Sequence, residues 1–173
     1  MSDFAHRLQL DQIRDGDRID LHGDDAECVA VAERLGLLSL TRLEAHSILD
    51  KDGDRVRAQG RVKAALEQPC VATGDPVPAM VDEAFDLHFV PAPTGGSADE
   101  EHELGDEELD TIFHDGMAID LGSAIADTLS LALDPYPRSA NADAALREAG
   151  VMSEEEASPF AALAALKGKL SGE

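Results

Sequence analysis

The sequence contains no tryptophan and few other aromatic residues. Among 173 residues there are one tyrosine and five phenylalanines, and aromatic side chains make up 3% of the chain. Aliphatic residues must therefore build the core, and a single domain of this length buries about two-thirds of the surface that its unfolded chain exposes. Cysteine is also scarce. Cys28 and Cys70 are far apart and form no CxxC pair, so we expect no disulfide, no metal site and no cofactor.

Long apolar runs are missing as well. No run approaches the roughly 18 residues that a membrane-spanning helix needs, and the opening stretch "MSDFAHRLQL" has no apolar segment that could act as a signal peptide. We therefore expect a cytoplasmic protein that does not contact a membrane.

Basic residues are absent from the middle of the chain. Residues 64–137 contain 17 acidic residues and no Lys or Arg, whereas residues 1–63 hold 10 of the 14 basic residues, and the net charge is −22. This balance argues against simple electrostatic binding of nucleic acid, which needs clustered Lys and Arg. It favours a basic protein or cations as partners, or high solubility alone. An acidic surface is also typical of salt-adapted organisms, and the sequence leaves these alternatives open.

The common catalytic motifs are absent too. There is no GxxxxGK[ST], GxGxxG, HExxH or GxSxG. The stretch "DKDGD" lacks the spacing of a calcium loop, because its glycine is the fourth residue and not the sixth. We therefore expect no enzymatic activity. The alternative is a metal-dependent nuclease acting on RNA through the acidic run Asp99–Asp110.

Hydrophobic periodicity predicts strands and helices in alternating blocks. Strands are expected at 4–10, 18–22, 37–49, 55–64, 77–90 and 109–114, and helices at 26–36, 118–133 and 142–150, with Asp120 capping the second helix. The expected fold class is α+β. It comprises an antiparallel sheet of about five to six strands, arranged as a meander or a partly closed barrel, packed with three to four helices.

A β-hairpin is predicted around "DKDGD". If Asp52-Gly53 forms a two-residue primed turn, Leu49 faces Val56 and Leu43 faces Val62 on one side of the sheet.

The other face of this hairpin carries a basic stripe. The stripe consists of Arg55, Arg57, Arg61 and Lys63. One interpretation is a solvated face balanced by Glu44, Asp82 and Asp86. The other is a contact patch for RNA phosphate or an acidic partner.

The chain is expected to form one α+β domain over 1–138 and a C-terminal tail over 139–173. Within the domain, residues 91–108 are turn-rich and acidic and should form a mobile loop. The tail should end in a short helix at about 159–170, with Ser158 as N-cap and Pro159 at its first position.

The stretch "LALDPYPRSA" ends an apolar helix pattern in a proline-fixed segment. Two prolines flank Tyr136, the single tyrosine, and they make the segment rigid. Tyr136 can bury its ring and keep its hydroxyl bonded, and Arg138 supplies a bidentate donor. Both are candidate binding residues.

Three stretches together carry a family resemblance. "EQPCVATGDPV", "IDLGSAIADTLSLALDPYPR" and "SPFAALAALKGKL" occur in this order. The chain resembles, over roughly residues 1–170, the YceD family of large ribosomal RNA subunit accumulation proteins, in the form found in alphaproteobacteria. Many relatives carry CxxC where this chain has Cys70 and Thr73, and an Asn where it has Ser158.

The resemblance implies a role in accumulation of large-subunit ribosomal RNA and hence in ribosome assembly. It brings no catalytic residues. We expect a non-catalytic assembly factor that binds a large-subunit ribosomal protein, ribosomal RNA or a pre-ribosomal particle. The final helix, with Phe160 and Lys167, is a further candidate docking element. The oligomeric state stays open.

Overall fold

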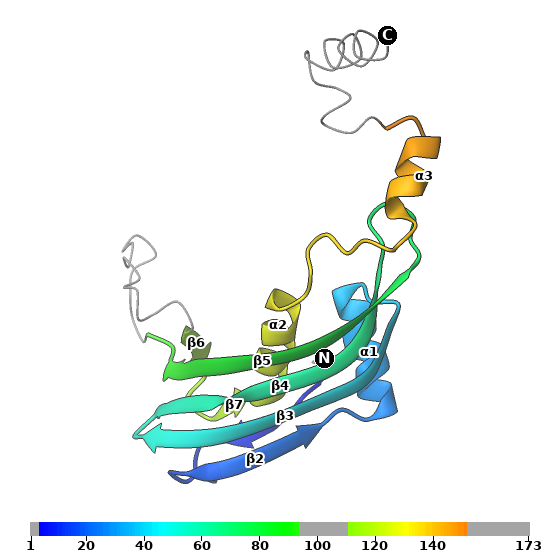
Figure 1. The fold of residues 1–173 in the computed structure, drawn as a ribbon. Helices are drawn as coiled ribbons and strands as arrows, with labels where there is room; N and C mark the ends of the chain where they lie inside the picture. The colour runs from blue at the N-terminus through cyan, green and yellow to red at the C-terminus, as the bar shows by residue number, and fades with distance from the viewer. Residues whose placement is uncertain (1–3, 94–110, 152–173) are drawn as a thin grey trace, which may run out of the picture. The chain divides into compact units, whose positions relative to one another are not determined.

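The computed structural model describes residues 4–93 and 111–151, which form an α+β fold with a five-stranded and a two-stranded sheet (Figure 1). The elements are β1 (Arg7–Gln9), β2 (Asp17–His22), α1 (Asp25–Leu35), β3 (Ser39–Asp52), β4 (Arg55–Pro69), β5 (Pro76–Pro91), β6 (Thr111–His114), β7 (Ala118–Asp120), α2 (Leu121–Leu131) and α3 (Ala142–Glu148). None of the helices in these described ranges has the length and apolar character needed to cross a bilayer.

The described residues divide into two compact units. The first comprises those within Met1–Gln68 and Pro78–Pro135, and the second those within Pro69–Val77 and Tyr136–Glu173. The predicted division into a domain over 1–138 and a tail over 139–173 stays a prediction. Most of the expected acidic loop at 91–108 and the whole expected helix at 159–170 lie outside the described residues.

The larger sheet has the strand order β2-β3-β4-β5-β6. β3 is antiparallel to both β2 and β4, but β6 is parallel to β5, so the predicted purely antiparallel meander is wrong at its last strand. A parallel neighbour needs a crossover connection of about a dozen residues or more, and residues 92–110 supply that length. Among the described strands, β2 and β6 are the two edges and do not pair. The sheet is therefore mixed and open, and the barrel alternative is wrong.

The β3–β4 hairpin forms as predicted, but its register differs by two residues. Its two-residue loop is Gly53-Asp54, so Leu49 faces Ala58 and not Val56. Gly53 has φ of 61°, and no non-glycine residue among those described has a positive φ. This pattern matches a type II′ turn, which places glycine at the first central position. A shift of two residues leaves the side chains from Arg42 to Ala65 on their predicted faces, since strand side chains alternate with period two. The alternation of β3 is interrupted only between Leu40 and Arg42, where the register shifts.

Both helices of the first unit begin at an aspartate. Asp24 caps α1 in a reciprocal capping box with Glu27, and Asp120 accepts from the Ser123 N–H at 3.0 Å at the start of α2, as predicted. The second helix is shorter than predicted because residues 118–120 instead form β7 against β1. Three residues are too few for alternation to be recognised in the sequence.

The core of the first unit lies between one face of the five-stranded sheet and the two helices α1 and α2, which lie on the same side of it (Figure 1). β4 illustrates the alternation that creates this face. Val56, Ala58, Val62 and Ala64 are buried, whereas the basic residues between them are exposed. The sheet therefore has an apolar inner face and a polar outer face.

One buried hydroxyl on the inner face has no hydrogen-bond partner. Ser47 is 1% exposed and its Oγ is unsatisfied. Because burying an unpaired hydroxyl costs free energy, we expect Ser47→Ala to leave the free energy of unfolding unchanged or to raise it by about 1 kcal/mol. Urea unfolding followed by far-UV circular dichroism measures this. As a contrast, Ser39→Ala removes a hydroxyl that donates to Glu67 at 2.9 Å and should lower stability by about 1 kcal/mol. A clear loss of stability in Ser47→Ala would show that the Ser47 hydroxyl does have a hydrogen-bond partner.

Candidate binding surface

The predicted basic stripe lies on the outer, solvent-facing side of the sheet. Arg55, Arg57, Arg61 and Lys63 are all exposed, with Gln59 half-buried between them. The alternation of β4 brings these four side chains onto one face, as the sequence pattern indicated.

Carboxylates of β5 pair with most of this stripe. Arg57 donates from Nε to Asp86 at 2.8 Å, and Gln59 donates to the same carboxylate at 2.9 Å. Arg61 donates from Nε to Asp82 at 2.8 Å, and the Lys63 ammonium lies 3.7 Å from it. The stripe is thus a set of cross-strand ion pairs.

The pKa values of these groups reflect the pairing. The hydrogen bonds from Arg57, followed by that from Gln59, lower the pKa of Asp86, and the hydrogen bond from Arg61 lowers that of Asp82. The hydrogen bond with Asp86 raises the pKa of Arg57. These carboxylates therefore stay ionised at neutral pH and compensate the arginines facing them. Arg55 is the member of the stripe that has no ion-pair partner among the described residues.

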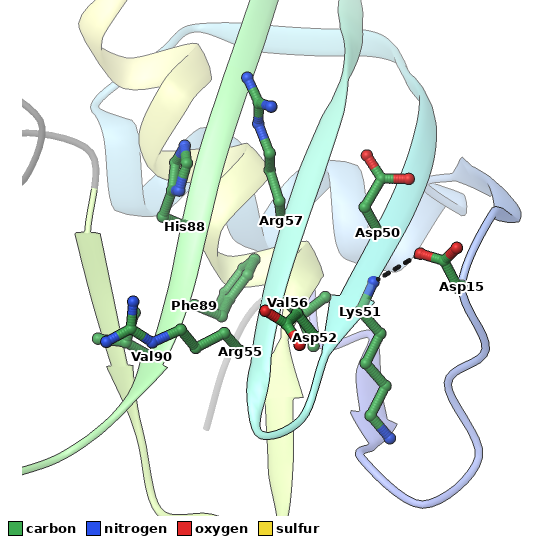
Figure 2. Close-up of a pocket in the computed structure, with 10 residues that line it drawn as sticks. All are labelled: Asp15, Asp50, Lys51, Asp52, Arg55, Val56, Arg57, His88, Phe89 and Val90. Carbon is green, nitrogen blue, oxygen red and sulfur yellow. Dashed lines mark hydrogen bonds between the residues drawn. The ribbon is translucent and has the colours of Figure 1, made fainter.

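A shallow cavity of about 300 Å³ lies beside the stripe, at the end of the β3–β4 hairpin. Figure 2 shows how several of its side chains lie: Arg57 and the His88 ring extend in one direction, the Arg55 guanidinium lies to the side, and the Lys51 amine points the opposite way. Asp50 and Asp52 also line it. Because the cations do not converge on a common point, this cavity has no preformed cradle for a phosphate.

Removing the two paired arginines together tests whether the stripe contacts RNA. We expect Arg57→Gln combined with Arg61→Gln to leave large-subunit ribosomal RNA at wild-type levels in cells, with a slight loss of stability, because exposed ion pairs contribute little. Quantitative gel analysis of ribosomal RNA checks the first point and thermal unfolding the second. A fall in ribosomal RNA with the fold intact would show that the stripe binds.

The second unit contains a compact cluster around Cys70. Its thiol is 3% exposed, and its sulfur accepts a hydrogen bond from the Ser139 N–H at 3.3 Å. Thr73 donates from its hydroxyl to Asp75 at 2.7 Å, and the same hydroxyl lies 3.4 Å from the Ser139 hydroxyl. Hydrogen bonds from Ser139, then from Thr73, lower the pKa of Cys70 to about 6. This contact could not be predicted from the sequence, because Ser139 is 69 residues away from Cys70 in the chain.

The lowered pKa of Cys70 predicts a pH dependence of stability. An acid whose pKa is lower in the folded state than in the unfolded chain stabilises the fold when ionised. The contribution of Cys70 should be fully present above about pH 9 and be lost as the pH falls through about 6. Urea unfolding of the wild type and of Cys70→Ser at several pH values measures it. The free energy of unfolding of the wild type relative to Cys70→Ser should increase from pH 6 to pH 9. A difference that does not change with pH would contradict this prediction.

The remaining predicted site residues lie in the second unit or outside the residues that the structure describes. Tyr136 is 74% exposed, so its ring is not buried as the sequence suggested it could be. Arg138 pairs with Asp143 at 3.2 Å. Phe160 and Lys167 lie outside the described residues. Within the described ranges, no group of three or more His, Cys, Asp or Glu side chains is placed to hold a metal ion.

Comparison with known proteins identifies one family. The model of the family described as large ribosomal RNA subunit accumulation protein YceD matches residues 58–167. Comparisons with curated proteins and with solved structures returned no match. The matched span runs from within β4 through α3. It includes Arg61 and Lys63 of the basic stripe, and the Cys70 cluster, but not Arg55 or Arg57. The chain therefore belongs to the YceD family of large ribosomal RNA subunit accumulation proteins.

Proposed function

We propose that this protein is a non-catalytic factor in assembly of the large ribosomal subunit, and that it acts by binding a basic large-subunit ribosomal protein, alone or on a precursor particle. The family description links the chain to accumulation of large-subunit ribosomal RNA. A net charge of −22 supports a basic partner.

The observation that favours a protein partner over RNA is the pairing of the basic stripe. Phosphates approaching Arg57 and Arg61 would meet the ionised carboxylates of Asp86 and Asp82 at the same place. Each phosphate contact would therefore have to replace an existing ion pair, which removes most of the electrostatic gain of RNA binding.

A ribosomal protein that has not yet met its RNA is a polycation without counter-charges. An acidic protein can screen it temporarily, and the opposite charges speed the encounter between the two. Such an association weakens as salt rises, because screening shortens the reach of surface charges to about 8 Å at physiological ionic strength. Rising local RNA concentration would then displace the acidic protein from its partner.

Co-purification from lysate tests this proposal. The tagged full-length chain is captured at low and at high salt, and the bound proteins are identified by mass spectrometry. We expect one or a few large-subunit ribosomal proteins at low salt and less of them at high salt. An unrelated tagged domain of similar negative charge serves as control. Equal recovery on that domain, or no ribosomal protein on this chain, would overturn the proposal.

A further inference from the structure

The first unit has a second concave surface, distinct from the one beside the basic stripe. It is a groove of about 320 Å³ bounded by β6, β7 and the N-terminal half of α2. Apolar side chains form much of it, among them Phe89, Ile112, Ile119 and Ala124.

Two large apolar side chains are exposed at or next to this groove. Phe113 of β6 is 57% exposed and lines the groove, and Met117, in the turn between β6 and β7, is 65% exposed. Neither contributes to the core cluster. An exposed aromatic at the edge of an apolar groove is typical of a protein-binding surface.

The charged side chains of the groove are mostly acidic. Asp115, Asp120 and Asp127 line it, against Arg7 as the single Lys or Arg, and Arg7 pairs with Asp115 at 2.9 Å, so the three carboxylates outnumber the one cation of the lining. The Asp127 side chain is 70% exposed and pairs with Arg34 at 3.3 Å. Hydrogen bonds from the backbone N–H groups of Met117 and Ala118 lower the pKa of Asp115, so it stays ionised at neutral pH. The groove therefore combines an apolar surface with a net negative charge.

We infer that this groove is the docking site for the ribosomal protein partner and that it takes an extended basic segment, with an apolar side chain against Phe113 and Lys or Arg side chains beside Asp115 and Asp127. This inference rests on the proposed function and adds to it the site and the conformation of the bound segment.

The position of β6 favours an extended segment. β6 pairs with β5 on one side, and no described strand pairs with its other side. The edge of a sheet offers unpaired backbone groups to an added strand, whose alternate side chains then enter neighbouring pockets. A ribosomal-protein segment rich in Lys and Arg can bond to this edge while its charges meet the carboxylates.

Charge also argues against other occupants. Residues 94–110 of the chain itself carry eight carboxylates and no Lys or Arg, and a second copy of the protein carries the same net charge of −22. RNA would bring phosphates to the groove carboxylates. Like charges at the contact would disfavour binding of each of these three occupants: the chain's own segment, a second copy and RNA.

Two substitutions with matched controls test the site. Phe113→Ser removes the exposed aromatic, and Asp127→Lys reverses the most exposed carboxylate. Met80→Ser is the control for the first, since Met80 is 75% exposed on β5 outside the groove. Asp143→Lys is the control for the second, because its side chain is 74% exposed and pairs with one arginine at 3.2 Å.

The probe is the protein fraction extracted from purified large ribosomal subunits, applied to the immobilised full-length chain at low salt. Each protein retained by the wild type is then purified and titrated against all variants. We expect Phe113→Ser to weaken binding about tenfold or more and Asp127→Lys to weaken it about three- to tenfold, with both controls near the wild type. Circular dichroism verifies the fold of each variant. A second measurement does not depend on the variants. In the wild-type complex, the backbone amides of residues 111–114 should be protected from hydrogen–deuterium exchange.

The outcomes separate the two proposals. Retention of no ribosomal protein by the wild type overturns the proposed function and this inference together. Retention that both variants preserve, with no protection of residues 111–114, overturns the groove and leaves the proposed function standing. A dimer in sedimentation equilibrium that Phe113→Ser abolishes would make a second copy the occupant. Binding of ribosomal RNA that Asp127→Lys strengthens and Phe113→Ser abolishes would make RNA the occupant. Either result would overturn the inference.

Discussion

Replacing Gly122 with alanine is expected to destabilise the protein by about 3 kcal/mol or more. A Cβ added at Gly122 would lie 2.1 Å from the Phe4 carbonyl oxygen and 2.8 Å from the His6 nitrogen. Both are backbone atoms, so no side chain can turn away to make room. The Leu121 N–H donates to the His6 carbonyl at 3.1 Å next to this contact. The start of α2 is thus held against the N-terminal segment at a distance that only glycine allows.

The sign of this effect is opposite to the helix propensity. Alanine is normally favoured over glycine inside a helix by about 1 kcal/mol, so propensity alone predicts that Gly122→Ala stabilises α2. Ser123→Ala is the matched control, because Ser123 is the next residue of the same turn and its hydrogen bond to Asp120 comes from the backbone N–H, which alanine keeps. Urea unfolding followed by far-UV circular dichroism compares the two. A stabilised Gly122→Ala variant would show that the N-terminal segment does not pack on α2 in solution.

The same contact shows why part of the fold could not be predicted from the sequence. Apolar periodicity reports which face of an element is buried, and it correctly indicated α1, α2 and the two faces of the hairpin. It does not report what lies against that face. The close approach of Phe4 to Gly122 joins positions far apart in the chain. Neither of its partners has a local signal for it.

The direction of β6 and the existence of β7 could not be predicted from the sequence, for related reasons. Alternation in β6 is the same whether the strand runs parallel or antiparallel to β5, and the direction is decided by the length of the connection and by packing. β7 has three residues, Ala118–Asp120, too few to show a period. The groove formed by β6, β7 and α2 could therefore not be anticipated, although Phe113 and Asp127 were visible in the sequence.

The basic stripe was more accessible to prediction. Alternation placed Arg57 and Arg61 on one face, and Asp82 and Asp86 were expected as counter-charges on the next strand. The ion pairs at 2.8 Å agree with that expectation. Glu44, the third expected counter-charge, lies opposite Lys63 in the register that the type II′ turn sets; a two-residue turn at Asp52-Gly53 would have placed it opposite Arg61. Whether the stripe also binds a partner stays a prediction.

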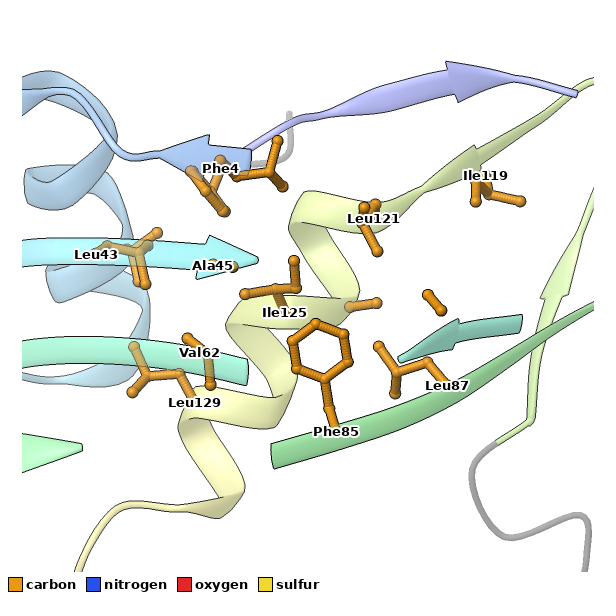
Figure 3. Packing of buried hydrophobic residues seen from close by; sticks show 14 of the residues in the cluster. Phe4, Leu43, Ala45, Val62, Phe85, Leu87, Ile119, Leu121, Ile125 and Leu129 are labelled. Carbon is orange, nitrogen blue, oxygen red and sulfur yellow. The ribbon is translucent and has the colours of Figure 1, made fainter. Parts of the chain in front are cut away.

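Truncation of Ile125 is the second large expected effect. Ile125 is fully buried on α2, and Figure 3 shows it among the core side chains, near Ala45 of β3 and Phe85 of β5. Ile125→Ala removes three carbons from the contact between the helix and the sheet. The cavity that remains can close only partly, because it lies between strands on one side and a helix on the other. We expect a loss of about 3 kcal/mol in the free energy of unfolding.

Leu131→Ala on the same helix is the matched control for this prediction. Leu131 is 89% exposed, so the same kind of aliphatic truncation there removes no packing and should change stability by less than about 0.5 kcal/mol. Both variants are measured by urea unfolding under identical conditions, which cancels effects of the denatured chain common to the two. The difference between them therefore reports the packing of α2 on the sheet. If the two substitutions cost the same, α2 would not use its Ile125 face to cover the core, and the groove between β6, β7 and α2 would lose one of its walls.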